Sequence, residues 1–343
     1  MILVKVDSSD VHRETPSGTK LDQLIFGDMV EEMKNLNLGN KEKLLLDSTY
    51  WDTNPALWRY HGFPLVEDVH LPHEIEQIRD LEIRDSDVFV VTYPKSGTSW
   101  MQQILLLLLS KGDIESVCKR SVYSNFELMS WIEVRQQVQK FINAESPRFS
   151  LSHLLFDMMP TALGQKKGKV IYVARNPKDI VVSYYYFHKI GRILETPKSF
   201  DDFFDKFLNG EVMAGSWFDH IKTWYSHRDE LNMLFITYEE MIMDLKSAVK
   251  KTADFLEIEL TEDELQNVVK HSTFENMKQN PKANYKNMAI LLDSTQGSLL
   301  RKGTIGDWKN HFTVSQNERF DKVFEREMKD FPVSFIWDIR DNS

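Results

Sequence analysis

The sequence is poor in cysteine and has no excess of basic residues. Cys118 is the one cysteine among 343 residues, which excludes an intrachain disulfide and a zinc site built on several cysteines and fits a reducing compartment. The chain has 42 Lys and Arg against 52 Asp and Glu, a net charge of −10. Nucleic-acid binding rests on a basic face, so this balance argues against a nucleic-acid partner, although a local basic pocket remains compatible with it.

Long hydrophobic runs are also missing. The longest apolar stretch covers residues 104–109, whereas a helix needs roughly 20 residues to cross a bilayer. The apolar N-terminus gives way at once to Lys5 and Asp7, so no hydrophobic segment of a signal peptide is evident. We therefore expect a cytoplasmic protein with no membrane partner.

No internal repeat, low-complexity tract or Pro/Gly/Ser-rich linker divides the chain. The length allows one large domain or two small ones, and the missing linker favours one. We expect a single domain over residues 51–343 after an N-terminal extension over residues 1–50. Within that extension, residues 20–38 have some helical periodicity.

Short apolar runs rich in β-branched residues alternate with helical patterns. Strands are predicted at residues 87–93, 169–174 and 232–237, and helices at residues 98–110, 177–186, 200–228, 243–256 and 261–279. Strands that alternate with helices pair in parallel, because each crossover carries a helix over one face of the sheet. The predicted fold is therefore α/β, a single domain with a central parallel sheet flanked by helices.

The loop after the first predicted strand has features of an anion site. It reads Tyr93-Pro-Lys-Ser-Gly-Thr-Ser-Trp100. In open parallel sheets ligands bind at the carboxyl ends of the strands, where a helix N-terminus offers free N–H groups to an anion. Lys95 adds a charge and Gly97 allows close approach of the backbone, so a phosphate or sulfate site is predicted; an ordinary turn with a surface lysine is the competing interpretation. The Gly-Lys-Ser/Thr of the ATPase P-loop is missing, which counts against a kinase.

Two further segments carry basic residues suited to an anion. Arg175 ends the second predicted strand, where a phosphate could be bound in bidentate fashion with Ser183 in reach; the alternative is a structural ion pair with Asp179. Arg301 and Lys302 lie close to Gly297, Gly303 and Gly306. They indicate either a loop that closes over an anionic ligand or a solvated basic turn.

Taken in order, three motifs resemble those of the cytosolic sulfotransferase family. They are Tyr93-Pro-Lys-Ser-Gly-Thr-Ser-Trp100, Arg175-Asn-Pro-Lys-Asp-x-x-x-Ser-Tyr184 and Arg301-Lys-Gly-x-x-Gly-Asp-Trp-Lys309. The likeness runs from about Trp58 to Trp337, and Asp219-His-Ile221 with Phe335-Ile-Trp-Asp-Ile339 is most similar to the amine sulfotransferase (type 3) branch. The resemblance implies a sulfotransferase fold with a P-loop-like phosphosulfate-binding loop.

The resemblance also implies that 3′-phosphoadenosine 5′-phosphosulfate (PAPS) is the sulfuryl donor. It assigns to the 5′-phosphosulfate the residues Lys95, Ser96, Gly97, Thr98, Ser99 and Trp100. It assigns to the 3′-phosphate Arg175, Ser183, Arg301, Lys302 and Gly303, and to the surroundings of the adenine Tyr238, Ser272, Thr273, Phe274 and Met277. For Phe274 and Met277, whose spacing is helical, a core position is the competing interpretation.

His153 is the catalytic base that the resemblance implies, with Lys95 stabilising the leaving phosphate. The family pattern Pro-Arg-x-x-Lys-Thr-His-Leu-Pro reads Pro147-Arg-Phe-Ser-Leu-Ser-His-Leu-Leu155 here, so Leu151 replaces a lysine. A catalytically weak PAPS- or PAP-binding protein of the same fold is therefore the alternative. The resemblance places Phe126 and Phe187 in the pocket of a small hydrophobic acceptor, which is an amine, a phenol or a steroid.

Residues 309–318 match the family's short dimer motif. The match implies a homodimer through Lys309, Thr313, Val314 and Glu318. A helix start with Ser315 as N-cap and Glu318 at the third helical position is the competing interpretation. The implied chemistry calls for no metal, and His70 and His73 lack the spacing of a catalytic zinc site, so we expect both on the surface.

Overall fold

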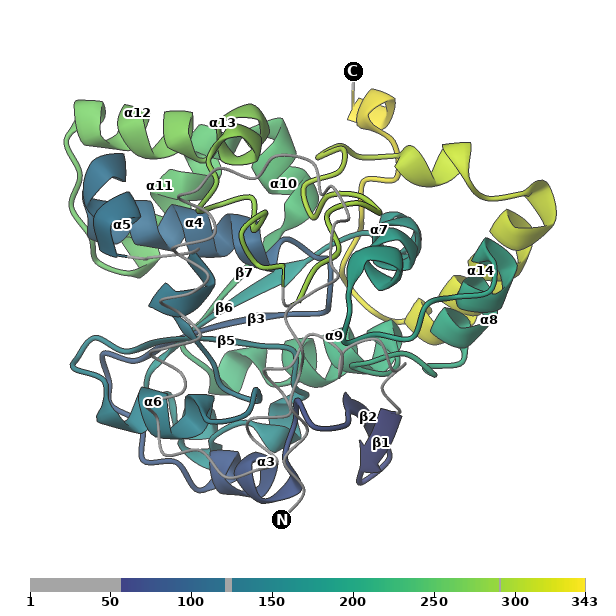
Figure 1. Cartoon of the computed structure of the whole chain (residues 1–343), viewed down its shortest axis with the longest axis horizontal. Coiled ribbons are helices and arrows are strands. Elements are labelled where there is room, and N and C mark those ends of the chain that lie inside the picture. Colours follow the sequence, from purple (N-terminus) through teal and green to yellow (C-terminus); the bar gives the residue numbers. More distant parts are fainter. Residues whose placement is uncertain (1–56, 121–124, 290, 343) are drawn as a thin grey trace, which may run out of the picture. The chain divides into compact units, whose positions relative to one another are not determined.

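A computed structural model describes residues 57–120, 125–289 and 291–342. Its centre is a five-stranded parallel sheet in the order β4-β5-β3-β6-β7 (Figure 1). The strands of this sheet are β3 (Val88–Thr92), β4 (Ser130–Trp131), β5 (Phe149–Ser152), β6 (Lys169–Ala174) and β7 (Met233–Thr237). An antiparallel hairpin joins β1 (Leu57–Tyr60) to β2 (Phe63–Val66). The predicted extension, residues 1–50, lies outside the described residues.

Helices cover both faces of the sheet (Figure 1). They are α3 (Pro72–Arg79), α4 (Thr98–Leu109), α5 (Ile114–Arg120), α6 (Gln137–Asn143), α7 (Pro177–Ile190), α8 (Phe200–Leu208), α9 (Trp217–Ser226), α10 (Tyr238–Met243), α11 (Leu245–Phe255), α12 (Glu262–His271), α13 (Phe274–Gln279) and α14 (Val314–Met328). Successive strand residues point to opposite faces. Val88 and Val90 of β3 therefore pack in one core with residues of α4, α11 and α12, whereas Phe89 and Val91 belong to a second core with residues of α3, α6 and α9.

The predicted fold class and the three predicted strands are confirmed, and the differences lie in polar or broken segments. β5 has the sequence Phe-Ser-Leu-Ser and is central in the sheet, but its alternating serines hide it from a search for apolar runs. The predicted helix over residues 200–228 is two helices, α8 and α9, because Gly210 and Gly215 adopt positive φ between them. The predicted helix over residues 261–279 is likewise α12 and α13, since Thr273 caps a new start.

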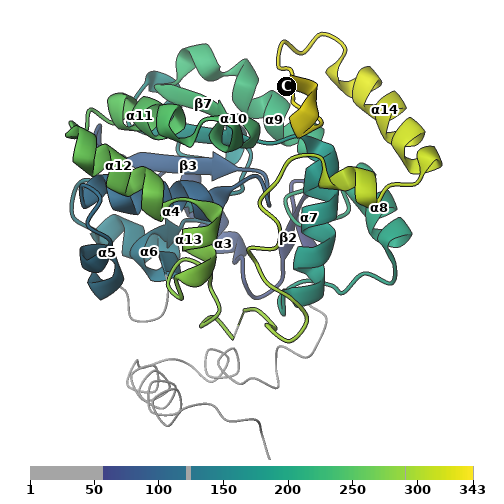
Figure 2. The ribbon, with the colours of Figure 1, turned by 90° about the horizontal axis from the view of Figure 1, so that it is seen from above.

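The carboxyl ends of the central strands converge on one region. Seen from above, α7 and α13 lie on either side of the end of β3 (Figure 2). Lys95 follows β3, and His153, Arg175 and Tyr238 come directly after β5, β6 and β7. The topology therefore brings together residues that the sequence scatters from 95 to 238. Across the described ranges, every helix is too short or too polar to traverse a bilayer.

Candidate active site

A cavity of about 260 Å³ opens at the carboxyl ends of the central strands. Strand ends, α7, α13 and the segment after α13 contribute to its wall, and the predicted residues that line it are Lys95, Gly97, Thr98, Ser99, Trp100, His153, Arg175, Ser183, Phe187, Tyr238, Phe274, Met277, Arg301, Lys302 and Gly303. Lys95, Arg175 and Arg301 lie close together in this wall, and we call their part of it the cationic end. Apolar side chains also line the cavity, among them Ile193, Met288 and Leu292.

The loop between β3 and α4 is folded tightly around Lys95 and Gly97. Lys95 has φ +71° and Gly97 has φ +113°, a backbone region that L side chains rarely adopt. A Cβ added at Gly97 would lie 3.0 Å from the ring of Tyr238, so glycine also allows this close packing. The hydroxyl of Ser96 is buried without a hydrogen-bond partner among the described residues, and an anion cradled by the loop would supply one.

Lys95 is half-buried, with its Nζ 4.1 Å from the ring centroid of Phe187. Desolvation lowers the pKa of Lys95 to about 7, and the positive charges of Arg175 and Arg301 add to the effect. Three cations thus share one end of the cavity and repel one another. A bound polyanion would relieve this repulsion and favour the charged lysine.

Arg175 joins two segments that are far apart in the sequence. One guanidinium nitrogen donates to the carbonyl oxygen of Lys95 at 3.0 Å and another to that of Thr304 at 3.3 Å. The guanidinium lies 4.1 Å from the ring centroid of Tyr238, a cation–π distance. The predicted alternative of an ion pair between Arg175 and Asp179 is wrong, because the Asp179 carboxylate accepts hydrogen bonds from the backbone N–H groups of Gly306 and Trp308.

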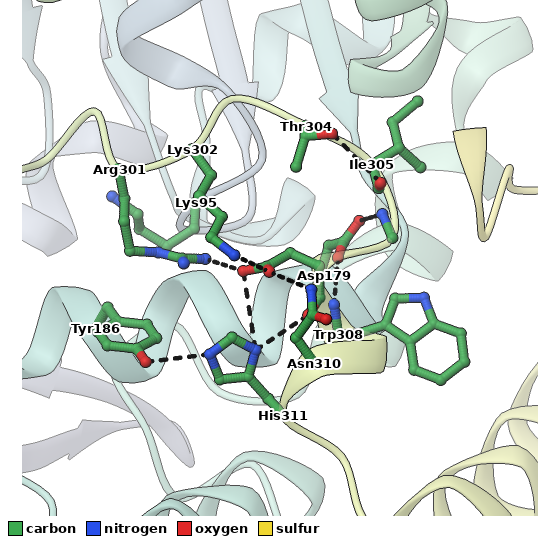
Figure 3. Close-up of polar contacts among 12 residues, drawn as sticks. Lys95, Asp179, Tyr186, Arg301, Lys302, Thr304, Ile305, Trp308, Asn310 and His311 are labelled. Carbon is green, nitrogen blue, oxygen red and sulfur yellow. Dashed lines mark hydrogen bonds and ion pairs between the residues drawn. The ribbon is translucent and has the colours of Figure 1, made fainter. Parts of the chain in front are cut away.

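Asp307 anchors the basic segment at residues 301–302. Its carboxylate lies 2.6 Å from a guanidinium nitrogen of Arg301 and 2.5 Å from the Nζ of Lys302. Figure 3 shows Arg301, Lys302 and Asn310 among the polar contacts of this segment. Although burial opposes its ionisation, hydrogen bonds from both cations and from Asn310 lower the pKa of Asp307 to about 2. Arg301 also stacks over Tyr186 at 4.5 Å. The segment is therefore held against the cavity and is not a freely solvated basic turn.

His153 is fixed by hydrogen bonds at three of its groups. Its Nδ1 lies 2.6 Å from the carbonyl oxygen of Thr92, and a carbonyl only accepts, so Nδ1 carries the proton. Its backbone N–H donates to Glu133 at 2.8 Å, and its carbonyl oxygen accepts from His220 at 3.2 Å. Desolvation lowers the pKa of His153 to about 4, with smaller contributions from His70 and Lys95. The imidazole is therefore neutral at pH 7, with a lone pair on Nε2.

A family model described as the sulfotransferase domain matches residues 85–332 of this chain. The chain belongs to the sulfotransferase family. It is 44% identical over 272 residues to an amine sulfotransferase of Oryctolagus cuniculus, covering 78% of this chain and 89% of the relative. It is 42% identical over 290 residues to sulfotransferase 2B1 of Mus musculus, covering 84% and 85%. These findings confirm the predicted family and the predicted enzyme class.

Solved structures agree with this family assignment. The crystal structure of mouse sulfotransferase SULT7A1 complexed with PAP has a TM-score of 0.69 and 31% identity to this sulfotransferase, and covers 80% of this chain and 96% of that one. Retinol dehydratase in complex with androsterone and inactive cofactor PAP has a TM-score of 0.70 at 24% identity, over 87% and 96% of the two chains. The second likeness shows the fold alone.

Other predicted residues of this sulfotransferase support the cavity from outside. Ser272 is fully buried, and its carbonyl oxygen accepts from the indole N–H of Trp100 at 2.7 Å. Thr273 caps α13 through its side chain. The side chain of Phe126 lies outside the described part of the chain.

The predicted dimer segment begins α14. Thr313 is the N-cap and forms a capping box with Gln316, so the predicted Ser315 cap is wrong by two residues. Lys309 pairs with Asp338 of its own chain at 2.5 Å. Val314 is 76% exposed and Glu318 is also exposed.

Three residues of the site were missed or misplaced by sequence reasoning. His70, expected on the surface, is buried, accepts a hydrogen bond from the backbone N–H of Val66 and lines the cavity; His73 is exposed as expected. Glu133 and His220 hold the backbone of His153. His220 lies in Asp219-His-Ile221, which the resemblance includes without a role for the histidine, and Glu133 lies in no motif. The available signal for Glu133 was composition, since it is the one charged residue in a stretch from Leu128 to Val134 that is apolar apart from Ser130.

Proposed function

We propose that this sulfotransferase transfers a sulfuryl group from PAPS to the hydroxyl or amine of a small hydrophobic acceptor. The observation that carries the proposal is that Lys95 and His153 line one cavity, at the ends of the neighbouring strands β3 and β5. A cation for the leaving group and a neutral base for the acceptor then meet in one site.

The cationic end of the cavity is proposed to hold the donor. The loop Lys95–Trp100 would bind the 5′-phosphosulfate, and Arg175, Ser183 and residues 301–303 the 3′-phosphate. Trp100, Tyr238, Phe274 and Met277 would surround the adenine. Support comes from the buried Ser96 hydroxyl and Arg175 Nε, neither of which has a hydrogen-bond partner among the described residues, and from the PAP complex of the 31% identical mouse sulfotransferase.

In the proposed mechanism the chain positions both reactants and moves one proton. PAPS supplies the sulfuryl group and leaves as PAP. His153 Nε2 takes the proton of the acceptor, since Nδ1 is committed to Thr92. Charged Lys95 stabilises the phosphate oxygen from which the sulfur departs. The anionic donor would raise the pKa of both side chains, because an opposite charge favours the protonated form.

The apolar end of the cavity is proposed to hold the acceptor. Phe187 and aliphatic side chains line it, which fits a hydrophobic molecule with one reactive polar group. The relative at 44% identity is named an amine sulfotransferase, which points to an amine acceptor. The relative at 42% identity is sulfotransferase 2B1, so an acceptor like that of the 2B1 branch is the other candidate. A homodimer through residues 309–318 and a cytoplasmic location complete the proposal; exposed Val314 supports the dimer.

Transfer of labelled sulfate from PAPS tests the proposal. The full chain is incubated with an alkyl amine, an aryl amine, a phenol, an oestrogen and a hydroxysteroid, and PAP binding is measured by calorimetry. Transfer to at least one acceptor is expected. Binding of PAP with no transfer to any of them would favour the catalytically weak binding protein, and failure to bind PAP would overturn the proposal.

A further inference from the structure

Glu133 is a buried acidic side chain in the wall of the cavity, beside the base. It follows β4 and is 2% exposed. Its Oε1 accepts the backbone N–H of His153 at 2.8 Å, while its Oε2 is buried without a hydrogen-bond partner among the described residues. Glu133, Lys95 and His153 line the same cavity. A buried polar atom without a partner calls for an explanation, and a ligand is one.

The elements around Glu133 differ from those that carry the cations assigned to the phosphates of the donor, so we assign Glu133 to the acceptor side. Trp131, two residues earlier, packs against the His153 ring with centroids 4.9 Å apart. Val134, one residue later, lines the cavity. The cations assigned to the phosphates of the donor lie after β6 and at residues 301–302, whereas Glu133 follows β4 at the other edge of the sheet. A carboxylate there would repel an anion and attract a cation.

An alkyl amine acceptor must lose one more proton than a hydroxyl acceptor. At pH 7 it is an ammonium ion without a lone pair, so it must lose one proton before its nitrogen attacks sulfur and a second proton afterwards. A hydroxyl acceptor loses one proton in total. His153 offers one lone pair, on Nε2. An alkyl amine that binds as the ammonium ion therefore needs a second proton acceptor in the cavity.

We propose that Glu133 binds the ammonium group of an alkyl amine acceptor and takes its first proton. This inference rests on the proposed sulfuryl transfer. The ammonium proton passes to Glu133 Oε2, and the freed lone pair forms the N–S bond. The S–O bond to the 5′-phosphate breaks, and its electron pair stays on the phosphate oxygen. The second nitrogen proton goes to His153 Nε2, and both protons pass to solvent after product release.

The ionisation of Glu133 suits this task. Burial raises its pKa to about 7, against the stabilising backbone N–H groups of His153 and of Glu133 itself. Burial also keeps His70 and His153 neutral at pH 7. Lys95, at the donor end, changes charge in the same pH range as Glu133, so a Glu133 variant is needed to separate the two.

The test compares wild type with Glu133→Gln, which keeps an oxygen to accept the His153 N–H. Acceptors are 2-phenylethylamine, its neutral analogue 2-phenylethanol, and phenol. We expect the variant to lose about 100-fold in kcat/KM for the amine, as removal of a proton acceptor does, and at least about tenfold less than that for phenol, whose single proton goes to His153. Raising the pH toward 9 should restore part of the amine activity, because free amine becomes available.

Binding of the acceptor can be measured without turnover, so it tests the proposal independently of the reaction rate. Calorimetry on the PAP complex is expected to show 2-phenylethylamine binding about tenfold weaker in Glu133→Gln, with 2-phenylethanol unchanged. In Lys95→Arg, where the charge at position 95 no longer changes with pH, the amine-to-alcohol affinity ratio should rise from pH 5.5 to pH 8 as Glu133 ionises, which decides the question even where the Glu133 variant is unstable. Equal losses of kcat/KM for the amine and phenol would show that Glu133 only positions His153. An unchanged kcat/KM for the amine would show that Glu133 does not act on the acceptor. No transfer by the wild type, with the amine binding difference intact, would overturn the proposed function instead.

Discussion

The Nδ1 of His153 lies 2.6 Å from the carbonyl oxygen of Thr92, across the neighbouring strands β5 and β3. Because this contact fixes the tautomer, Nε2 is the nitrogen left to accept a proton. His153→Ala is expected to lower kcat by a factor of about 10² to 10⁴ while PAP affinity changes by less than about threefold. Sulfate transfer and calorimetry measure the two effects. Full activity in His153→Ala would refute the assigned base.

Thr92→Val is the matched control for that experiment. It keeps the carbonyl oxygen that lies 2.6 Å from His153 Nδ1 and removes a hydroxyl that bonds to the side chain of Thr98 and lies 3.3 Å from the same Nδ1. We expect most of the activity to remain. A loss as large as that of His153→Ala would mean that the side chain, rather than the backbone carbonyl, orients the imidazole.

Donor binding should take up a proton at Lys95. Burial and two neighbouring guanidinium groups lower the lysine pKa to about 7, so the free enzyme at pH 8 holds this side chain mainly neutral. Bound phosphates raise the pKa again. Affinity for PAP is therefore expected to weaken as the pH rises from 7 to 9. Calorimetry in two buffers of different ionisation enthalpy measures the uptake, which should vanish in Lys95→Arg; equal uptake in both proteins would contradict the assignment.

Gly303→Ala should displace the Phe274 ring. A Cβ at Gly303 would lie 2.2 Å from that ring, and its φ of +64° disfavours alanine as well. PAP affinity is expected to fall at least tenfold, with the loss read by calorimetry. Gly62→Ala is the control, because Gly62 has φ +89° and open space around its Cβ. Both variants place alanine at a positive φ, so both carry the same kind of backbone strain. Similar PAP affinities in the two variants would show that Phe274 does not shape the donor site.

His188 should contribute to acid instability. Burial lowers its pKa to about 4, and the unfolded chain binds the proton more readily. The contribution of neutral His188 to the free energy of unfolding is complete above pH 6.5. It is lost as the pH falls toward 4, by up to about 3 kcal/mol. His188→Asn, which keeps a donor for the Glu195 carbonyl, should show a shallower fall of Tm between pH 6.5 and 4.5. His73→Asn, at an exposed position, should match the wild type.

Val314→Glu should disrupt the proposed homodimer. The residue is 76% exposed at the start of α14, where glutamate suits the helix dipole and the fold should be unharmed. Sedimentation is expected to show a shift toward monomer. Met243→Glu alters another exposed apolar side chain and should leave the mass unchanged. A wild-type chain that sediments as a monomer would show that the proposed homodimer does not form.

Those parts of the fold that depend on local pattern could be predicted from the sequence. Apolar runs identify β3, β6 and β7. Both faces of β3 and almost all of β6 are buried, whereas every second residue of β7 is only half-buried. β5 could not be found in this way. Its Ser150 is fully buried because the hydroxyl donates to the Ser130 carbonyl of β4, and such a bond depends on strand neighbours rather than on sequence neighbours.

The same distinction holds for the candidate site. Lys95, Arg175 and Arg301 lie in motifs, and the structure brings all three to one cavity. The partners that Thr92 and Glu133 provide for His153 lie in no motif. A backbone carbonyl such as that of Thr92 has no residue signature, and Glu133 reaches His153 only through the pairing of β4 with β5. Parallel register creates these contacts, and register is a property of the assembled sheet.

The two hydrogen bonds of Arg175 also bear on how the enzyme is made. One goes to the Lys95 carbonyl and the other to the Thr304 carbonyl, so the guanidinium is held in place only after residue 304 has left the ribosome. The last strand of the sheet ends at Thr237, well before this segment in the chain. The nucleotide site is therefore complete only when the domain folds as a unit, and the nucleotide can stabilise the fold only at the last step.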